Sequence, residues 1–167
     1  EAPTIDGNLS DPAWARAEVI DQFYQDQPNV GALSTEAMTV RILFDENNLY
    51  FGIYAYDQNP DDIAIRAMYR DGPMFTSDNV RIILDPGLTR RNGYSFQVAA
   101  SGGRRDGLIE NNANILYEWN AIWDSEVQVV DDGWIVEVAI PFRSVSYDPN
   151  QTDWGLEIGR TIRHKNE

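Results

Sequence analysis

The sequence lacks cysteine altogether, and this absence excludes disulfide frameworks, thiolate metal sites and cysteine nucleophiles. It holds one histidine, His164, so a histidine-centred hydrolytic triad or a multi-histidine zinc site has little support. The Gly102-Gly103 pair is followed by two arginines and an aspartate, which are not the residues of a phosphate-binding loop. Aspartate and glutamate are so abundant that a glycosidase-like carboxylate pair cannot be told from coincidence. We therefore expect a binding protein and not an enzyme.

Basic residues and long apolar runs are also scarce. Lysine and arginine together number 13 against 27 aspartates and glutamates, which gives a formal net charge of -14. A field of this sign repels polyphosphates and anionic lipid headgroups, so we expect no nucleic acid as a partner. No apolar run approaches the roughly 20 residues that a helix needs to cross a bilayer. We accordingly expect no direct membrane insertion of this domain.

The residues that are present suffice for one hydrophobic core. The chain has 167 residues, of which 43% are hydrophobic and 11% aromatic. A chain of this length buries roughly two-thirds of the surface that it exposes when unfolded. We expect a single domain over residues 1–167. Because the sequence opens without an initiator methionine and stops in a charged run at 160–167, we also expect it to be a fragment of a longer, processed protein.

Alternating apolar and polar residues predict β-strands along most of the chain. The predicted strands form three hairpins and a last strand: 39–44 with 49–56, 79–85 with 93–100, 126–130 with 134–140, and then 153–159. The step Asp132-Gly133 predicts a two-residue primed turn, because glycine tolerates positive φ. Residues 63–69 fit a strand or a helix. Several strands at short intervals predict an all-β fold, an antiparallel β-sandwich of jelly-roll type.

The N-terminal segment and the tryptophans add local detail. Asp11 is expected to cap a short helical turn, and Trp14 to plug one end of the core. Trp134 and Trp154 lie in apolar strand patterns and are predicted to be structural. Trp119 lies beside polar residues, so we expect its ring to be exposed and available for binding.

Four segments together resemble the family-nine carbohydrate-binding modules in order and spacing: 5–14 (IDGNLSDPAW), 40–50 (VRILFDENNLY), 77–85 (SDNVRIILD) and 133–142 (GWIVEVAIPF). The resemblance implies a non-catalytic β-sandwich that recognises an oligo- or polysaccharide. Residues 119–123 (WNAIW) and 140–144 (IPFRS) are similar to a group of exported bacterial proteins in which such a module precedes a predicted outer-membrane β-barrel. This implies the periplasm or cell surface as location, and the rest of its own chain as a partner.

The resemblance also implies where a sugar binds. In sugar-binding members an aromatic ring precedes the third of these segments, a carboxylate lies on its strand, an arginine lies on the next, and a tryptophan comes from a late loop. The matching positions here are Phe75, Arg81 and Gln97, so two polar groups differ, and the late loop falls beyond Glu167. Phe75 alone therefore supplies half of a ring clamp.

A different ring platform is the alternative, because sugar rings stack on aromatic faces while polar groups satisfy their hydroxyls. Its predicted members are rings and flanking hydrogen-bonding groups: Trp119, Trp123, Tyr94 and Tyr117 with Arg81, Gln97, Arg91 and Asn120. The predicted ligand-binding set is Phe75, Arg81, Gln97, Trp119, Asn120, Arg91 and Tyr94. Arg81 fits equally well as the partner of a nearby carboxylate.

Calcium is the one cofactor that the sequence allows. The resemblance implies structural calcium in some members, and four carboxylates offer oxygen ligands: Asp57, Asp61, Asp62 and Asp78. The spacing of an EF-hand is absent, and Asx-rich turns usually cap their own backbone.

Two further functions stay open beside carbohydrate binding. One is a structural or interaction domain appended to an outer-membrane barrel. The other is a haem-binding sandwich, because related domains hold haem b between a methionine and a basic side chain or histidine. The candidate haem ligands are Met38, Met68, Met74 and His164. A methionine in a strand is more often a core filler.

Overall fold

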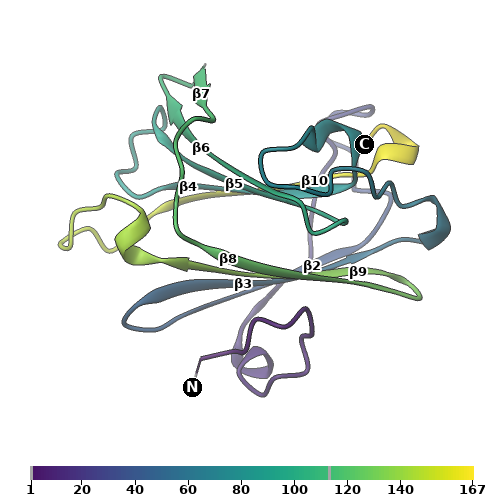
Figure 1. The fold of residues 1–167 in the computed structure, drawn as a ribbon, viewed down its shortest axis with the longest axis horizontal. Helices are drawn as coiled ribbons and strands as arrows, with labels where there is room; N and C mark the ends of the chain where they lie inside the picture. Colours follow the sequence, from purple (N-terminus) through teal and green to yellow (C-terminus); the bar gives the residue numbers. More distant parts are fainter. Residues whose placement is uncertain (1, 113) are drawn as a thin grey trace.

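Two antiparallel sheets pack face to face in the computed structural model, which describes residues 2–112 and 114–167 (Figure 1). Each sheet has five strands. The order is β1-β2-β3-β9-β8 in the first sheet and β10-β4-β5-β6-β7 in the second. The predicted all-β sandwich is confirmed.

The strand bounds follow the predicted hairpins closely. The first sheet contains β1 (Val19–Ile20), β2 (Met38–Phe44), β3 (Asn48–Tyr56), β8 (Asp124–Val130) and β9 (Gly133–Pro141). The second contains β4 (Asn79–Asp85), β5 (Gly93–Ala99), β6 (Arg104–Glu110), β7 (Asn114–Leu116) and β10 (Gly155–Thr161). Short 3-10 turns lie between them: η1 (Trp14–Arg16), η2 (Pro60–Asp62), η3 (Met74–Thr76), η4 (Phe142–Ser144) and η5 (Arg163–Lys165). Within the described residues, no helix is long and apolar enough to cross a membrane.

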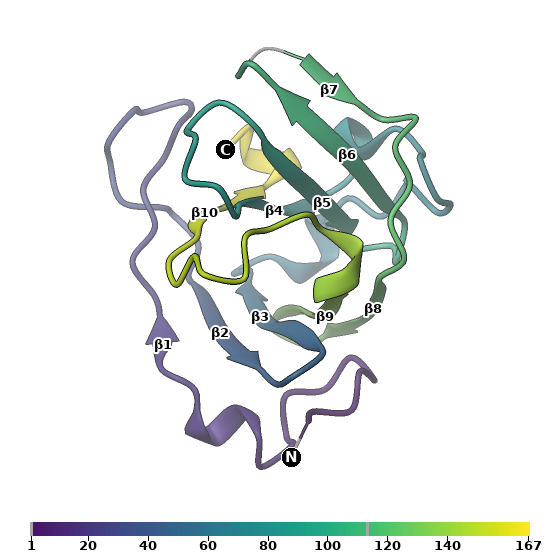
Figure 2. The same ribbon diagram turned by 90° about the vertical axis from the view of Figure 1, so that its left-hand side faces the viewer.

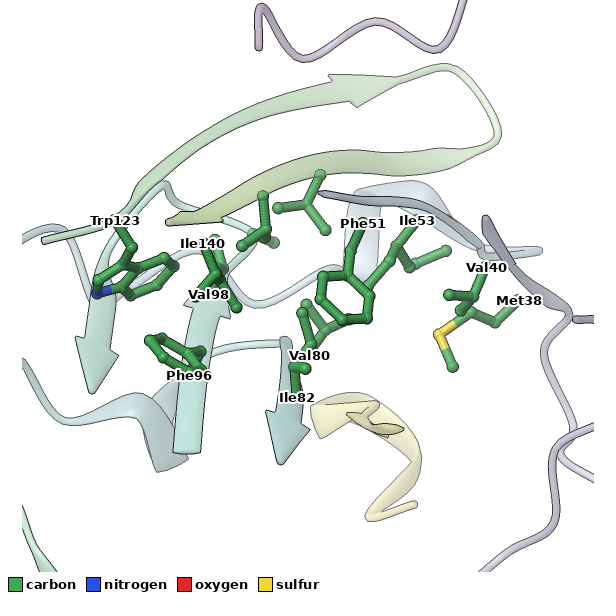
Figure 3. Packing of buried hydrophobic residues seen from close by; sticks show 14 of the residues in the cluster. Met38, Val40, Phe51, Ile53, Val80, Ile82, Phe96, Val98, Trp123 and Ile140 are labelled. Atoms are coloured by element: carbon green, nitrogen blue, oxygen red, sulfur yellow. The ribbon is translucent and has the colours of Figure 1, made fainter. Parts of the chain in front are cut away.

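The core lies between the sheets, because apolar side chains alternate along the central strands. Phe51 and Ile53 on β3 face Val80 and Ile82 on β4, and Phe96 on β5 extends the same layer (Figure 3). All five side chains are almost fully buried. Burying a side chain of this kind contributes roughly 1.5–3 kcal/mol relative to leaving it exposed. The predicted alternation of inner and outer residues along 49–56 is thereby confirmed.

The turn between β2 and β3 is built around Asp45. Its Oδ1 accepts hydrogen bonds from the backbone amides of Asn47 at 2.7 Å and Asn48 at 2.8 Å, and its Oδ2 accepts one from the Tyr50 hydroxyl at 2.7 Å. The hydrogen bonds from Asn47 and Tyr50 lower the pKa of the Asp45 carboxyl. The turn thus fixes the register in which Phe44 pairs with the start of β3.

The β8–β9 hairpin is present, but its turn differs from the predicted one. Val130 and Gly133 are Cα partners, so the turn residues are Asp131 and Asp132, one position earlier. Neither aspartate has a positive φ, so the predicted primed turn is wrong. Gly133 opens β9 at φ +150°, where a Cβ would lie 2.2 Å from the carbonyl oxygen of Ala55. The close approach of β3, and not the turn, requires glycine there.

The N-terminal segment lies on the outer face of the first sheet (Figure 1), where Glu137 of β9 holds it. The buried Glu137 Oε2 accepts hydrogen bonds from the amides of Asp6, Gly7 and Asn8 at 2.8, 2.7 and 3.2 Å. Its Oε1 accepts one from Trp14 Nε1 at 2.7 Å. Burial raises the pKa of the Glu137 carboxyl, and these four hydrogen bonds act in the opposite direction. The Ile-Asp-Gly motif therefore serves the scaffold.

Two predictions for this segment are wrong. Trp14 does not plug the end of the core: its ring lies 3.1 Å from where a Cβ on Gly52 would be, on the outer face of β3. Gly52 leaves the space that the ring fills. Asp11 does not cap η1, which has no side-chain cap; its Oδ2 instead accepts a hydrogen bond from the Thr4 amide at 2.7 Å.

Residues 63–69, which fitted a strand or a helix, form neither. Their backbone is held by side chains instead of by a ladder. Ser77 Oγ accepts hydrogen bonds from the amides of Arg66 at 2.8 Å and Ala67 at 2.7 Å. This anchoring leads the chain into η3 and β4, where the candidate site begins.

Candidate functional site

A hollow of about 760 Å³ lies on the outer face of the second sheet, beside β10. Its floor includes Arg81, Gln97 and Glu157. One wall is formed by residues 23–27. They belong to the connection between β1 and β2, which runs from the first sheet up past β10 (Figure 2). The hollow exists because this connection flanks the second sheet.

Three polar side chains project from adjacent strands on this face, and we refer to Arg81, Gln97 and Arg105 as the polar row. Arg81 and Gln97 are Cα partners between β4 and β5, and Gln97 and Arg105 are Cα partners between β5 and β6. Gln97 Oε1 accepts hydrogen bonds from Arg105 Nε at 3.2 Å and Nη2 at 2.9 Å. Arg81 Nη2 donates to Glu157 Oε1 at 2.9 Å. Each member of the row is therefore held by a partner on a neighbouring strand.

An aromatic ring lies at the Arg105 end of the polar row. The Arg105 guanidinium carbon lies 4.0 Å from the centroid of the Tyr117 ring, which is a cation–π arrangement. A Cβ on Gly107 would lie 2.6 Å from Ile115 and 3.1 Å from Tyr117. Gly107 thus lets the ring lie close to the sheet, next to the guanidinium that it supports.

A second hollow of about 480 Å³ continues along the same face. Arg81 and Glu157 line both hollows, so the two meet at this ion pair. The second hollow has an apolar part at Ile109 and a basic part at Arg91. Together they offer a surface that combines apolar contact with hydrogen-bond donors.

Phe75 is exposed, at 71% of its surface, in η3 immediately before β4. Asn79 Nδ2 ties this turn to the strand, donating to the carbonyl oxygens of Met74 at 3.2 Å and Ser77 at 3.1 Å. Asn79 also lines the first hollow. The predicted ring is therefore free of the core, at the end of β4 that leads into the polar row.

The structure places Trp119 and Tyr94 on the other side of the second sheet. Tyr94 pairs with the buried Leu84, and its side chain packs on the core side. The Trp119 ring lies 5.1 Å from the Tyr94 ring and 6.2 Å from the Phe96 ring, between centroids. Trp119 is half-buried against the core and is not the exposed ring that its polar neighbours suggested. Trp123 is buried as well.

The remaining predicted ligand-binding residues are split between two places. Arg91 is exposed and lines the second hollow, where its Nη2 donates to Asn111 Oδ1 at 3.2 Å. Asn120 is exposed beside Trp119, where its Nδ2 donates to the Glu118 carbonyl oxygen at 3.0 Å. Arg91 therefore joins the same face as the polar row, whereas Asn120 stays with the core-side ring.

The carboxylates predicted as calcium ligands do not gather at one point. Asp57 Oδ2 lies 2.9 Å from His164 Nε2 and 3.7 Å from Nη2 of Arg160, whose side chain is buried. Asp78 is buried and accepts hydrogen bonds from backbone amides, and burial raises its pKa. Among the residues that the structure describes, no group of three or more histidines or carboxylates is placed to hold a metal ion. The other two predicted ligands are exposed in η2: Asp61 and Asp62.

The candidate haem ligands also lie in different environments. Met38 is buried in the main core and Met74 in a separate small cluster. Met68 is exposed, and His164 is engaged by Asp57. Their placement gives the haem hypothesis no support.

Three residues on this face were missed by sequence reasoning. Arg105 and Glu157 flank Arg81 and Gln97 on neighbouring strands, and extending the predicted pairing to β6 and β10 finds them. Tyr24, 62% exposed, lies in the wall of the first hollow. Its position depends on where the β1–β2 connection packs, and no local pattern indicates it.

Comparisons with known proteins agree with this architecture. A family model described as carbohydrate family 9 binding domain-like matches residues 5–162. A family 9 carbohydrate-binding module from Caldicellulosiruptor kristjanssonii in complex with cellotriose superposes with a TM-score of 0.67 at 19% identity, covering 95% of this chain and 71% of that chain. Its complex with glucose gives a TM-score of 0.69 at 18% identity, covering 97% and 75%. No curated protein sequence matches the chain.

Proposed function

The chain belongs to the carbohydrate family 9 binding domain-like family, and we propose that it is a non-catalytic module that binds an oligo- or polysaccharide on the outer face of its second sheet. The observation that carries the proposal is the polar row, two members of which lie in the floor of the first hollow, with aromatic rings at its margins. A similar fold in the Caldicellulosiruptor module holds cellotriose and glucose.

The chemistry of this face suits a sugar. A pyranose ring needs an aromatic face for its apolar C–H surface and donors or acceptors for its hydroxyls. Tyr117, Tyr24 and Phe75 offer exposed ring surface. Arg105 fixes Gln97 Oε1, which leaves the amide Nε2 of Gln97 as a donor toward the ligand. A hydroxyl-rich ligand can therefore be stacked and hydrogen-bonded at the same time.

The proposal predicts that Tyr117→Ala weakens carbohydrate binding about tenfold or more, because it removes the ring surface and frees Arg105. A glycan array followed by titration calorimetry on the glycan that binds best is the measurement. Phe44→Ala is the matched control, since Phe44 is a 77% exposed aromatic residue at the end of β2 in the other sheet. Equal losses in both variants, or a normal affinity for Tyr117→Ala, contradict the proposed site.

Three expectations from the sequence stay predictions: bound calcium, export to the periplasm or cell surface, and an outer-membrane barrel region that follows the module. For calcium, the melting temperature in the presence of calcium is compared with that in a chelator. A higher value with calcium supports a site, and an unchanged value counts against it. Fractionation of cells that produce the full-length protein tests the location.

A further inference from the structure

We infer that the carbohydrate bound on this face is anionic, a glycan whose carboxylate or sulfate groups pair with the guanidinium groups of the polar row. The inference rests on the proposed function, because it names the ligand class of the same face. Two observations support it: the distribution of charge over the molecule, and the hydrogen bonding of Arg81 and Arg105.

The outer face of the second sheet is less acidic than the molecule as a whole. Acidic residues outnumber basic ones by 27 to 13 over the chain. The residues that line the two hollows nevertheless include five arginines against four carboxylates, and one of the five, Arg160, is buried and paired with Asp57. Arg105 adds a further cation from the next strand. An anionic ligand is repelled by most of this surface, and the balance reverses at the polar row.

The spacing and the free N–H groups of Arg81 and Arg105 suit the binding of anions. Arg81 and Arg105 lie two strands apart, which is roughly 10 Å in a sheet. Arg105 is held by Gln97 and by the Tyr117 ring, so little conformational entropy is lost when it binds. In the described part of the chain, the hydrogen bonds of Arg105 use its Nε and Nη2 and that of Arg81 uses its Nη2, which leaves Arg105 Nη1 and Arg81 Nε and Nη1 for a ligand. A guanidinium with free N–H groups suits the paired oxygens of a carboxylate.

Without a ligand, the Glu157 carboxylate occupies the position on Arg81 that the negative group of the ligand would take. Its carboxylate pairs with Arg81 at 2.9 Å, yet 62% of its side chain is exposed. An exposed ion pair of this kind contributes roughly 0–1 kcal/mol, so an incoming anion can displace it at small cost. The Glu157 charge then opposes the ligand. Removing that charge is expected to strengthen binding, which a general loss of structure cannot do.

The test measures calorimetric affinities for charged probes and their neutral counterparts. Oligogalacturonate and its carboxyl-reduced form serve for carboxylates, and a sulfated galactan oligosaccharide and its desulfated form serve for sulfates. We expect at least one charged probe to bind about tenfold or more tightly than its neutral form, with an affinity that falls as salt rises. The pair that shows this difference identifies the anionic group.

Two substitutions are expected to act in opposite directions on the charged probe. Arg105→Gln weakens binding about tenfold, and Glu157→Gln strengthens it about threefold. Arg143→Gln is the matched control, an exposed arginine in η4 outside this face, and leaves the affinity unchanged. If Arg105→Gln misfolds, Glu157→Gln at its exposed position still decides the matter.

Equal or tighter binding of the neutral forms overturns the inference while the proposed function stands. Failure of charged and neutral probes alike also overturns the inference, and the proposed function is then decided by the glycan array. A weaker affinity of Glu157→Gln for the charged probe also contradicts the inference, because it makes Glu157 a ligand-binding group and not a competitor.

Discussion

At the scale of single residues, one buried carboxylate connects two motifs that are far apart in the sequence, residues 5–14 and residues 133–142. Glu137 lies in the middle of β9, and its oxygens accept hydrogen bonds from three backbone amides and one indole N–H of the N-terminal segment. Gly7 adopts φ +83°, a conformation that lets successive amides converge on one oxygen. The residues by which the family is recognised at both places therefore hold the N-terminal segment against the first sheet.

Glu137→Gln is expected to lower the free energy of unfolding by roughly 3 kcal/mol, because an amide NH₂ replaces an acceptor that faces only donors. Urea denaturation followed by tryptophan fluorescence measures the change. The control is Glu126→Gln, the exposed Cα partner of Glu137 on β8, with an expected change within about 0.5 kcal/mol. A loss below about 1 kcal/mol for Glu137→Gln contradicts the role of this carboxylate.

Residue-scale reasoning from sequence named Arg81 and Gln97, which the structure pairs on one face, and Phe75, which is exposed. It misjudged Trp119. Polar neighbours suggested that Trp119 is exposed, yet its ring packs beside Tyr94 and Phe96. The polarity of adjacent residues does not fix the direction of a side chain in an irregular segment. In a strand, side chains alternate between the two faces of the sheet, so their direction is fixed. Arg81 and Gln97 are Cα partners on adjacent strands and therefore face the same side.

At the scale of elements, alternation predicted seven of the described strands and missed β1, β6 and β7. It was less successful at the turns. The β8–β9 turn is one residue earlier than the Asp132-Gly133 pattern indicated, because Gly133 is required by the nearby β3 backbone. A turn motif and a close packing contact both select glycine, and the sequence alone does not separate them.

The β2–β3 turn makes a pH-dependent contribution to stability. Hydrogen bonds from Asn47 and Tyr50 lower the pKa of Asp45 in the folded state below the ordinary 3.8. The stabilisation is therefore present above that ordinary value and is lost as pH falls through the folded pKa. Asp45→Asn is expected to lower the urea midpoint at about pH 7, with a difference from the parent protein that shrinks at about pH 2.5. A difference that is equal at both pH values contradicts this account.

Strand pairing at the same scale assembles the polar row. Gln97 was predicted on β5, but Arg105 lay in a segment to which no strand was assigned. The β5–β6 ladder places it directly beside Gln97. Extending the residue pairing of the predicted β4–β5 hairpin to a further strand would have found Arg105. The contact of Arg105 with Tyr117 depends on the path of the chain after β7 and could not be found in this way.

At the scale of the whole molecule, the two outer faces of the sandwich are unequal. The N-terminal segment covers part of the outer face of the first sheet, and Trp14 fills the space above Gly52. The outer face of the second sheet is open, hollowed, and bordered by the β1–β2 connection (Figure 2). This asymmetry is the reason why we propose the second sheet as the binding face. It could not be predicted from sequence, because it depends on how two irregular segments pack onto finished sheets.

The claim that carbohydrate binds on the outer face of the second sheet is tested most directly by nuclear magnetic resonance. Backbone amide shifts are recorded for the isotope-labelled protein while the glycan that binds best in the array is titrated in. We predict that the largest shift changes map to the polar row and its neighbours, at Arg81, Gln97, Arg105 and Glu157. Changes concentrated on the outer face of the first sheet, at the stacked rings of Tyr54 and Tyr56, would contradict the account.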